Sequence, residues 1–243
     1  MKFNNDNLNI GHRQRLREKF ISSKDSLYDY ELLEMLLFLS NSRKDTRGIA
    51  KELINNFGSL NNVLDAGVDD LQKVPNIGLS NAIALKTIRE VINRVLKNDI
   101  KQKGIQLNNS TKVEEYCKLS IGNSKNEVIK ALFLNGKLDL VKDEIIGNGN
   151  INEVKLYKNV LITKATQYGC CNIILVHNHP TNDVNPSVAD IQLTIDLKEL
   201  LSMVDMNLVD HIIVSKDYSL SMAKEGLMNK QKALKYISKK LFN

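Results

Sequence analysis

One stretch, residues 177–190, constrains the fold of this chain more than any other. It reads HNHPTNDVNPSVAD and follows the apolar run NIILV at residues 172–176, which is short, rich in β-branched residues and bounded by polar ones. Such a run is typical of a buried strand. Residues i and i+2 share one face of a strand, so His177 and His179 can aim both imidazoles at one point. Asp190, at the start of the next predicted helix, adds a carboxylate, and the three side chains together predict a metal site.

The donor set of this predicted site fits a catalytic zinc ion. Such an ion takes three protein ligands and keeps its fourth position for water, and His177, His179 and Asp190 supply two nitrogens and one oxygen. We therefore expect one Zn²⁺ per chain. Two alternatives stay open: a lone His-x-His pair is often structural, and the run from Ser187 to Asp190 is also a variant of the helix-capping box, with Pro186 before it.

The composition favours a globular protein of the reducing interior of the cell. With 243 residues, 42% hydrophobic and 26% charged, the chain is long enough for two domains. Cys117, Cys170 and Cys171 form no C-x-x-C pair and are odd in number, which argues against a disulfide framework and against cysteine zinc ligands. Because the sequence has neither a signal-peptide core nor an apolar run of about 18 residues, we expect a cytoplasmic protein with no membrane partner.

The positive charge is concentrated at the two ends of the chain. Residues 1–103 carry 17 Lys and Arg against 13 Asp and Glu, residues 104–228 carry 12 against 15, and residues 229–243 carry five lysines and no acid. Basic segments on either side of a mildly acidic body indicate a polyanionic partner such as nucleic acid. Solvated surface lysines are the alternative.

The first 103 residues predict a small all-α domain. An apolar helix over residues 28–39 is followed by helical segments that end near Gly58 and Ala66. Residues 69–85 then read DDLQKVPNIGLSNAIAL, a short helix, a Pro-x-x-Gly turn and a longer helix. This pattern resembles a helix-hairpin-helix, in which backbone N–H groups of the 74–80 hairpin and the second helix face a DNA phosphate. Asn76 stands where that motif usually has its first glycine; such hairpins also serve in plain helical packing.

Residues 104–228 predict a second domain of mixed structure, after a polar linker placed at residues 97–112. A strand over residues 127–134 turns at Asn135 and Gly136 into a second strand, and further strands at 172–176, 207–214 and 218–222 alternate with helices. This order predicts an α/β fold with a mixed sheet flanked by helices. Residues 229–243 predict a separate basic C-terminal helix.

The spacing of the polar residues in this second domain carries a resemblance to a known family. Glu144, His177-x-His179-Pro180, Ser187 and Asp190 together resemble the JAB/MPN (JAMM) metalloprotease motif. Over residues 12–228 the chain is similar to the bacterial RadC, or UPF0758, family. The resemblance implies a JAB/MPN, cytidine-deaminase-like fold after the hairpin module. Asn76 and the lysine-rich tail depart from the family pattern.

The resemblance also implies roles for the residues of the motif. His177, His179 and Asp190 would hold zinc, Glu144 would hold a water molecule and shuttle its proton, and Ser187 would donate to the developing oxyanion. The implied reaction is hydrolysis of a peptide or isopeptide bond in an unknown protein or peptide.

Three neighbouring residues provide alternatives for parts of this assignment. Asp143 points to the opposite face of the strand from Glu144, and Glu153 is a more distant candidate for its role. His211, in an Asp-His pair that the family shares, is interpreted as a packed residue or one that orients a metal ligand.

Two other functions remain as alternatives to the hydrolase. One is a DNA-repair or recombination accessory protein that binds DNA and has a structural or vestigial metal site. The other is a metal-dependent nuclease, which is less well supported because the ligands of only one metal are visible, whereas many nucleases use two.

Overall fold

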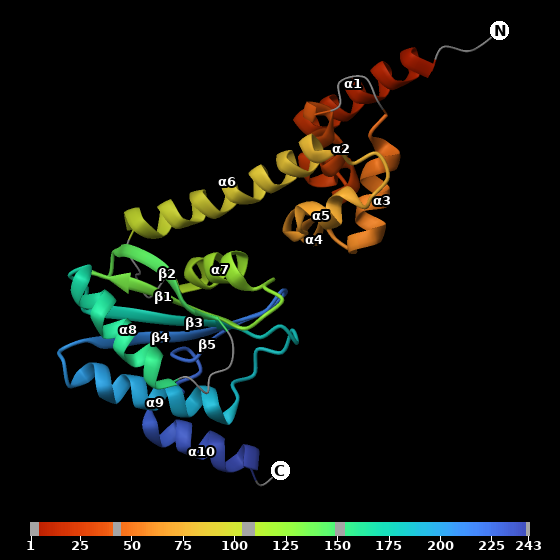
Figure 1. Cartoon of the computed structure of the whole chain (residues 1–243). Helices are drawn as coiled ribbons and strands as arrows, with labels where there is room; N and C mark the ends of the chain where they lie inside the picture. Colours follow the sequence, from red (N-terminus) through yellow and green to blue (C-terminus); the bar gives the residue numbers. More distant parts are fainter. Residues whose placement is uncertain (1–4, 41–44, 104–109, 149–153, 242–243) are drawn as a thin grey trace. The chain divides into compact units, whose positions relative to one another are not determined.

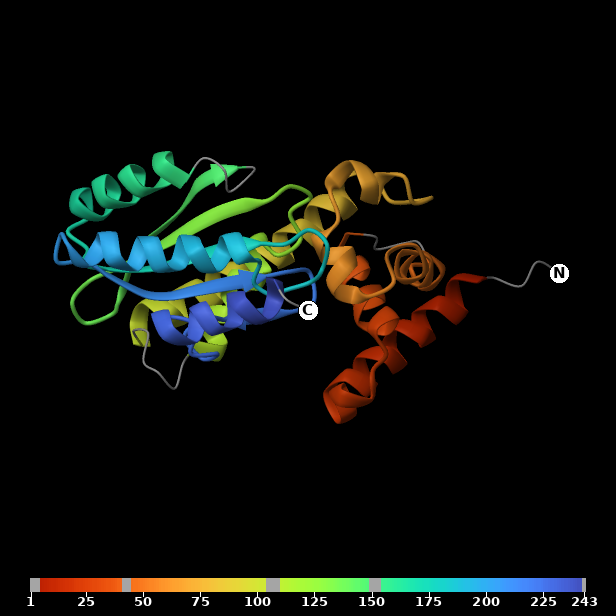
Figure 2. The ribbon, with the colours of Figure 1, turned by 90° about the horizontal axis from the view of Figure 1, so that it is seen from below.

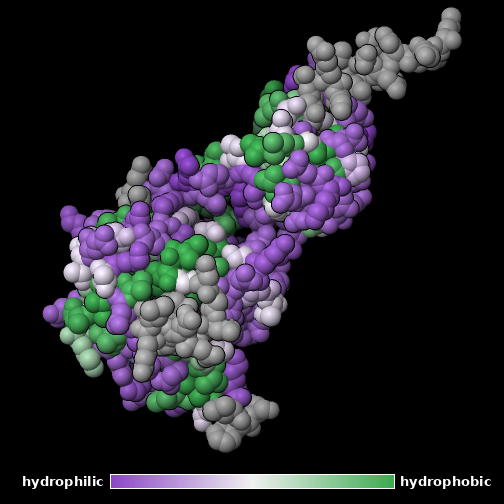
Figure 3. All heavy atoms as spheres, in the orientation of Figure 1, coloured by the Kyte–Doolittle hydropathy of each residue, from purple (hydrophilic) through white to green (hydrophobic). Residues whose placement is uncertain are grey.

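The chain divides into two compact units, Met1–Ile92 and Asn93–Asn243. The computed structural model describes residues 5–40, 45–103, 110–148 and 154–241 (Figure 1). No helix among these residues is long and apolar enough to cross a membrane. The surface seen in Figure 3 is largely hydrophilic, with hydrophobic residues in smaller patches.

The first unit is all-helical, as its sequence predicts. Its helices are α1 (Asn5–Ser23), α2 (Asp29–Ser40), α3 (Arg47–Phe57), α4 (Leu60–Asp65), α5 (Val68–Gln72) and the first part of α6 (Leu79–Lys103), with a short 3₁₀ helix η1 (Lys24–Ser26) after α1. Its core consists of buried aliphatic side chains of α2 to α6, among them Leu33, Leu37, Leu53, Leu71 and Leu85. The predicted stop of α3 at Gly58 is confirmed, because this glycine has φ 84° and caps the helix in the left-handed region.

The second unit is built on a five-stranded mixed sheet in the order β2-β1-β3-β4-β5. The strands are β1 (Val128–Leu134), β2 (Leu140–Asn148), β3 (Asn172–Asn178), β4 (Asn207–Val214) and β5 (Ser219–Ser221). β3 and β4 run parallel, and the other neighbouring strands are antiparallel. All seven residues of β1 and of β3 are buried, which explains why the run at residues 172–176 is continuously apolar rather than alternating.

Helices cover both faces of this sheet (Figures 1 and 2). On one face, α7 (Ser110–Ile121) packs through Val113 and Cys117 against β1, β3 and β4. On the other, α8 (Val154–Gln167) and α9 (Val188–Ser202) pack through Leu161 and Leu193. α10 (Lys230–Leu241) lies along α9. The structure confirms the predicted mixed sheet flanked by helices, preceded by a helical region.

Two local expectations are wrong. The connection between β1 and β2 is not a tight Asn-Gly turn but a longer loop, since β1 ends at Leu134 and β2 begins at Leu140. Within the loop, Asn135 Oδ1 accepts hydrogen bonds from the N–H groups of Lys137 and Asp139, both at 2.9 Å. In this loop Leu138, not Gly136, has the positive φ, of 65°. The linker placed at residues 97–112 is helical at its start, since α6 continues to Lys103.

Candidate metal centre

Three side chains meet at the end of β3. The nearest ligand atoms of His177, His179 and Asp190 all lie within 4.8 Å of one another. The Nε2 atoms of the two histidines are 2.8 Å apart. Asp190 Oδ1 lies 3.2 Å from Nε2 of His177, and Asp190 Oδ2 lies 3.5 Å from Nε2 of His179. His177 and Asp190 are buried and His179 is half-buried, so His179 is the one of the three side chains that solvent reaches.

The backbone around these histidines is fixed by a buried asparagine between them. Asn178 is fully buried, and its Oδ1 accepts a hydrogen bond from the N–H of Val128, at 2.7 Å, while its Nδ2 donates to the carbonyls of Ser124 and Asn126, both at 3.1 Å. These three bonds tie the end of β3 to the start of β1. The N–H of His179 donates to the carbonyl of Val214, at 2.8 Å, which ties the next residue to the end of β4.

A chain of hydrogen bonds behind His177 determines which of its nitrogens carries the proton. Thr194 donates its hydroxyl proton to the carbonyl of Asp190, at 2.6 Å, so it accepts from Nδ1 of His211, also at 2.6 Å. Burial lowers the pKa of His211, so this ring is neutral and its Nε2 has a lone pair. That lone pair accepts from Nδ1 of His177, at 2.8 Å. Nε2 of His177 is left as a free lone pair that faces His179 and Asp190.

His179 has the same tautomer for a different reason. Its Nδ1 lies 2.6 Å from the carbonyl oxygen of Asp183, which can only accept, so Nδ1 carries a proton and Nε2 is available as a ligand. In the metal-free protein the hydrogen bond to Asp190 raises the pKa of His179. Two lone pairs as close as those of His177 and His179 repel each other unless a proton or a cation lies between them.

Of the two carboxylate oxygens of Asp190, Oδ2 accepts a backbone hydrogen bond. Its Oδ2 accepts the N–H of Ser187, at 2.6 Å, while Ser187 Oγ accepts the N–H of Asp190, at 3.1 Å, a reciprocal capping box at the start of α9. Its Oδ1 is buried and accepts no hydrogen bond from the residues that the structure describes.

A buried anionic oxygen without a donor, facing two imidazole lone pairs, fits a divalent cation. The predicted capping box and the predicted inward-facing carboxylate therefore occur together in Asp190, as the sequence allows.

Glu144 lies on the same face of the sheet, on the edge strand β2. It pairs across the ladder with Ala131, which pairs with Leu175, two residues before His177. Its carboxylate forms an ion pair with Lys164 of α8 and accepts from the hydroxyl of Tyr168, at 2.6 Å. The Lys164 ammonium and then the Tyr168 hydroxyl lower the pKa of Glu144, so the carboxylate is ionised. Among the described residues, the contacts of Glu144 go to α8 and Tyr168 rather than to the histidines.

The alternatives to Glu144 are separated from it by the structure. Asp143 points to the opposite face of the sheet, as its place on the strand predicts. There its carboxylate forms ion pairs with Lys130, at 2.6 Å, and with Lys97, and it accepts a hydrogen bond from the hydroxyl of Tyr116, at 2.5 Å. Glu153 lies outside the described residues.

The sequence did not reveal several residues around the centre, namely Thr194, Asn178, Lys164 and Tyr168. A threonine four residues after Asp190 on the predicted helix was the one available signal, because i and i+4 share a helix face. The interpretation of His211 as a residue that orients a metal ligand agrees with its hydrogen bond to His177.

The sequence was compared with known proteins. The RadC-like JAB domain matches residues 107–227. A UPF0758 protein of Fusobacterium nucleatum subsp. nucleatum is 33% identical over 227 residues, which cover 90% of this chain and 98% of that protein.

Proposed function

The chain belongs to the RadC family of UPF0758 proteins, and on that premise we propose that it is a zinc-dependent hydrolase of the JAMM kind that cleaves a peptide or isopeptide bond. The observation that carries this proposal is the set of three donors at the end of β3. Both histidines have their Nδ1 protons occupied elsewhere, and Asp190 Oδ1 is buried without a donor. An ion bound there supplies polarisation of a carbonyl and activation of water for attack.

The remaining roles belong to Glu144 and Ser187. A proton acceptor must be ionised, and the pairing with Lys164 keeps Glu144 in that state. Glu144 then accepts a proton at its carboxylate and delivers it to the leaving amine, for which the contact with Lys164 or Tyr168 must loosen. Ser187 uses a lone pair of Oγ for the helix cap, so its hydroxyl proton remains available for donation to an oxyanion.

The metal part of the proposal is tested by the metal content of purified protein. We expect near one zinc per chain in the wild type and almost none in His177→Ala, because two donors do not hold the ion. His12→Ala is the matched control: this histidine pairs with Glu34 in the first unit, and its loss should leave the zinc content unchanged. A wild-type protein without bound metal, or zinc retained in His177→Ala, would contradict the proposal.

The hydrolytic part is tested by trapping substrates in cells. Glu144→Gln should keep its zinc and accumulate an uncleaved protein or peptide that the wild type releases, because the amide cannot accept the proton. Glu115→Gln, an exposed glutamate of α7, is the control. Equal turnover by Glu144→Gln and the wild type would leave a DNA-binding accessory protein with a structural metal as the better description.

We further propose that the hairpin of the first unit binds a DNA phosphate. Asn76 has φ 65°, the left-handed conformation that such a turn needs, and Val74 and Ile77 on either side are buried anchors. Gly78 is exposed just before α6, where the first N–H groups of a long helix lack helical partners. These features support contact with the DNA backbone and no reading of base sequence.

A single added charge tests the DNA contact. Gly78→Asp should weaken binding to a DNA duplex about tenfold or more, because it places a carboxylate beside the phosphate, and a side chain fits there since nothing lies within 4 Å of its Cβ position. Gly48→Asp, also exposed and with equally open space in α3, adds the same charge away from the hairpin. Binding by wild type that does not weaken with salt, or that Gly78→Asp leaves intact, would contradict the proposal.

A further inference from the structure

The basic helix α10 lies beyond the part of the chain that the RadC-like JAB domain matches, which ends at residue 227. Asn229 caps it, since its Oδ1 accepts from the N–H groups of Gln231 and Lys232. The lysines of this helix predict a site for a polyanion, but in the structure Lys230 and Lys240 contact other residues of the same unit.

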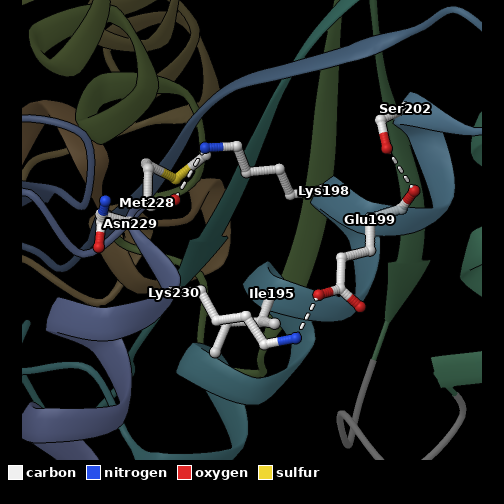
Figure 4. A pocket seen from close by; sticks show the side chains of 7 residues that line it. All are labelled: Ile195, Lys198, Glu199, Ser202, Met228, Asn229 and Lys230. Carbon is white, nitrogen blue, oxygen red and sulfur yellow. Dashed lines mark hydrogen bonds and ion pairs between the residues drawn. The ribbon is translucent and has the colours of Figure 1, made fainter.

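The first turn of α10 is fastened to α9 across a shallow groove (Figure 4). Lys230 forms an ion pair with Glu199, at 2.5 Å, and Lys198 donates to the carbonyl of Met228, at 2.8 Å. Ile195, Ser202 and Asn229 also line the groove. These contacts anchor the first turn of the helix.

The other end of α10 reaches the segment that joins His179 to Ser187, which we call the metal loop (residues 180–186). Lys240 donates to the carbonyl of Pro186, at 2.5 Å, and its ammonium lies 5.7 Å from the centre of the Tyr236 ring. Val184 of the loop packs in one apolar cluster with Tyr236 and Ile237. The helix therefore holds the loop by one hydrogen bond and shares an apolar cluster with it.

Both contacts lie one residue away from a bond that aims a group of the metal centre. Val184 follows Asp183, whose carbonyl fixes the ring of His179. Pro186 precedes Ser187, whose N–H holds the carboxylate of Asp190. The metal loop has no helix or strand of its own, and it is also tied by a pair of hydrogen bonds between Asn182 and Asp217, at 2.9 and 3.2 Å.

We propose that α10 acts as a brace for the metal loop, with Lys240 as a positioning residue that keeps His179 and Asp190 in the geometry for metal binding. The inference rests on the proposed function, because it concerns the same metal centre. Lys240 touches neither the metal donors nor a substrate; it acts through the carbonyl of Pro186. Without this bond the loop is held at its Pro186 end less firmly, although Val184 and Asn182 keep their contacts, and a shift of the loop moves the ring of His179 with it.

The test uses Co²⁺ as a probe in the metal-free full-length protein, because the visible absorption of bound Co²⁺ reports on the arrangement of its ligands. Lys240→Met keeps most of the side-chain length and removes the donor. It should lower the affinity for Co²⁺ about tenfold, the lower end of the range for residues behind metal ligands, and alter the absorption bands. Lys240→Arg should restore both, because it returns a cationic donor. Lys239→Met, at the exposed neighbouring position, makes the same charge change and should behave as wild type.

The outcomes separate the two proposals. If the wild type binds Co²⁺ and Lys240→Met binds it with the same affinity and spectrum, the brace is overturned while the metal site stands. An equal effect of Lys239→Met and Lys240→Met would also overturn it, since general charge would then be the cause. A wild type that binds no Co²⁺ overturns the proposed function and the brace together.

Discussion

The two faces of the five-stranded sheet bury polar groups in opposite ways, and neighbouring residues of β2 mark the difference. Asp143 faces α7, where Lys130, Lys97 and Tyr116 surround its carboxylate. Glu144 faces α8, on the side where His177 and Asp190 lie. On the α7 face, positive charges compensate the buried carboxylate. On the other face, the described charged groups within ion-pair distance of Asp190 are the two histidines rather than lysines, and the imidazole lone pairs of these histidines face each other.

This difference separates polar groups that pair within the fold from polar groups that could hold a ligand. A buried charge with its partners contributes to the free energy of unfolding, and its loss leaves the partners uncompensated. A buried acceptor without a partner costs free energy in the empty protein, and a bound cation recovers that cost.

The largest stability effect should come from the α7 face. Asp143→Asn removes the charge that Lys130 needs, and we expect the free energy of unfolding to fall by about 3–5 kcal/mol, with zinc content unchanged. Chemical denaturation measures the first and elemental analysis the second. Asp205→Asn, at an exposed position, should change neither. A stability loss below about 1 kcal/mol would mean that this cluster is no more than a surface pair.

Acid should weaken the same cluster. Burial raises the pKa of Asp143, but the hydrogen bond and charge of Lys130 outweigh it and hold the pKa well below its usual range. The stabilisation is therefore complete above the ordinary aspartate pKa of about 3.9, and it is lost as the pH falls towards the lowered value in the folded protein. The gap in stability between wild type and Asp143→Asn should narrow below about pH 4, and a gap that widens there would contradict the assignment.

A smaller effect is expected behind the metal centre. Thr194→Val keeps the shape of the side chain but removes the acceptor of His211 Nδ1, so the hydrogen-bond chain no longer fixes the tautomer of His177. The affinity for Zn²⁺ should fall about 10- to 100-fold. Thr163→Val, on the exposed side of α8, is the control. Unchanged affinity in Thr194→Val would show that the ring is oriented without this chain.

The smallest effect on stability should come from Glu144. Its ion pair with Lys164 is partly exposed, so Glu144→Gln should change the free energy of unfolding by less than about 1 kcal/mol, although we expect it to abolish hydrolysis. An unchanged denaturation curve together with loss of hydrolysis in Glu144→Gln would distinguish the role of Glu144 from that of Asp143 most directly. A destabilisation similar to that of Asp143→Asn would remove the contrast between the two faces.

The order of helices and strands and the approach of His177, His179 and Asp190 to one another were predictable because their signals are local. An apolar run that ends in His-x-His places two side chains on one face of a strand. The residues from Ser187 to Asp190 predict the start of a helix, independently of any role in metal binding. The end of α6 was misplaced because residues 97–103 are polar and a long helix that leaves the core has no apolar stripe to mark it.

The residues around the triad could not be predicted because they meet it only in the folded chain. Thr194 and His211 lie on different elements, and Lys164 reaches Glu144 only because α8 crosses β2. In the same way, nothing in the lysine-rich sequence of α10 distinguishes Lys240, which donates to the carbonyl of Pro186, from its neighbour Lys239.

The shared carboxylate of Asp190 has a consequence for how the state of this protein can be observed. Oδ2 accepts the N–H of Ser187 at the start of α9 and lies 3.5 Å from Nε2 of His179, while Oδ1 lies 3.2 Å from Nε2 of His177. An ion that fixes the carboxylate also fixes that hydrogen bond, so loading should slow the exchange of the Ser187 amide with deuterated water. A single backbone amide would then report on occupancy without any substrate in hand.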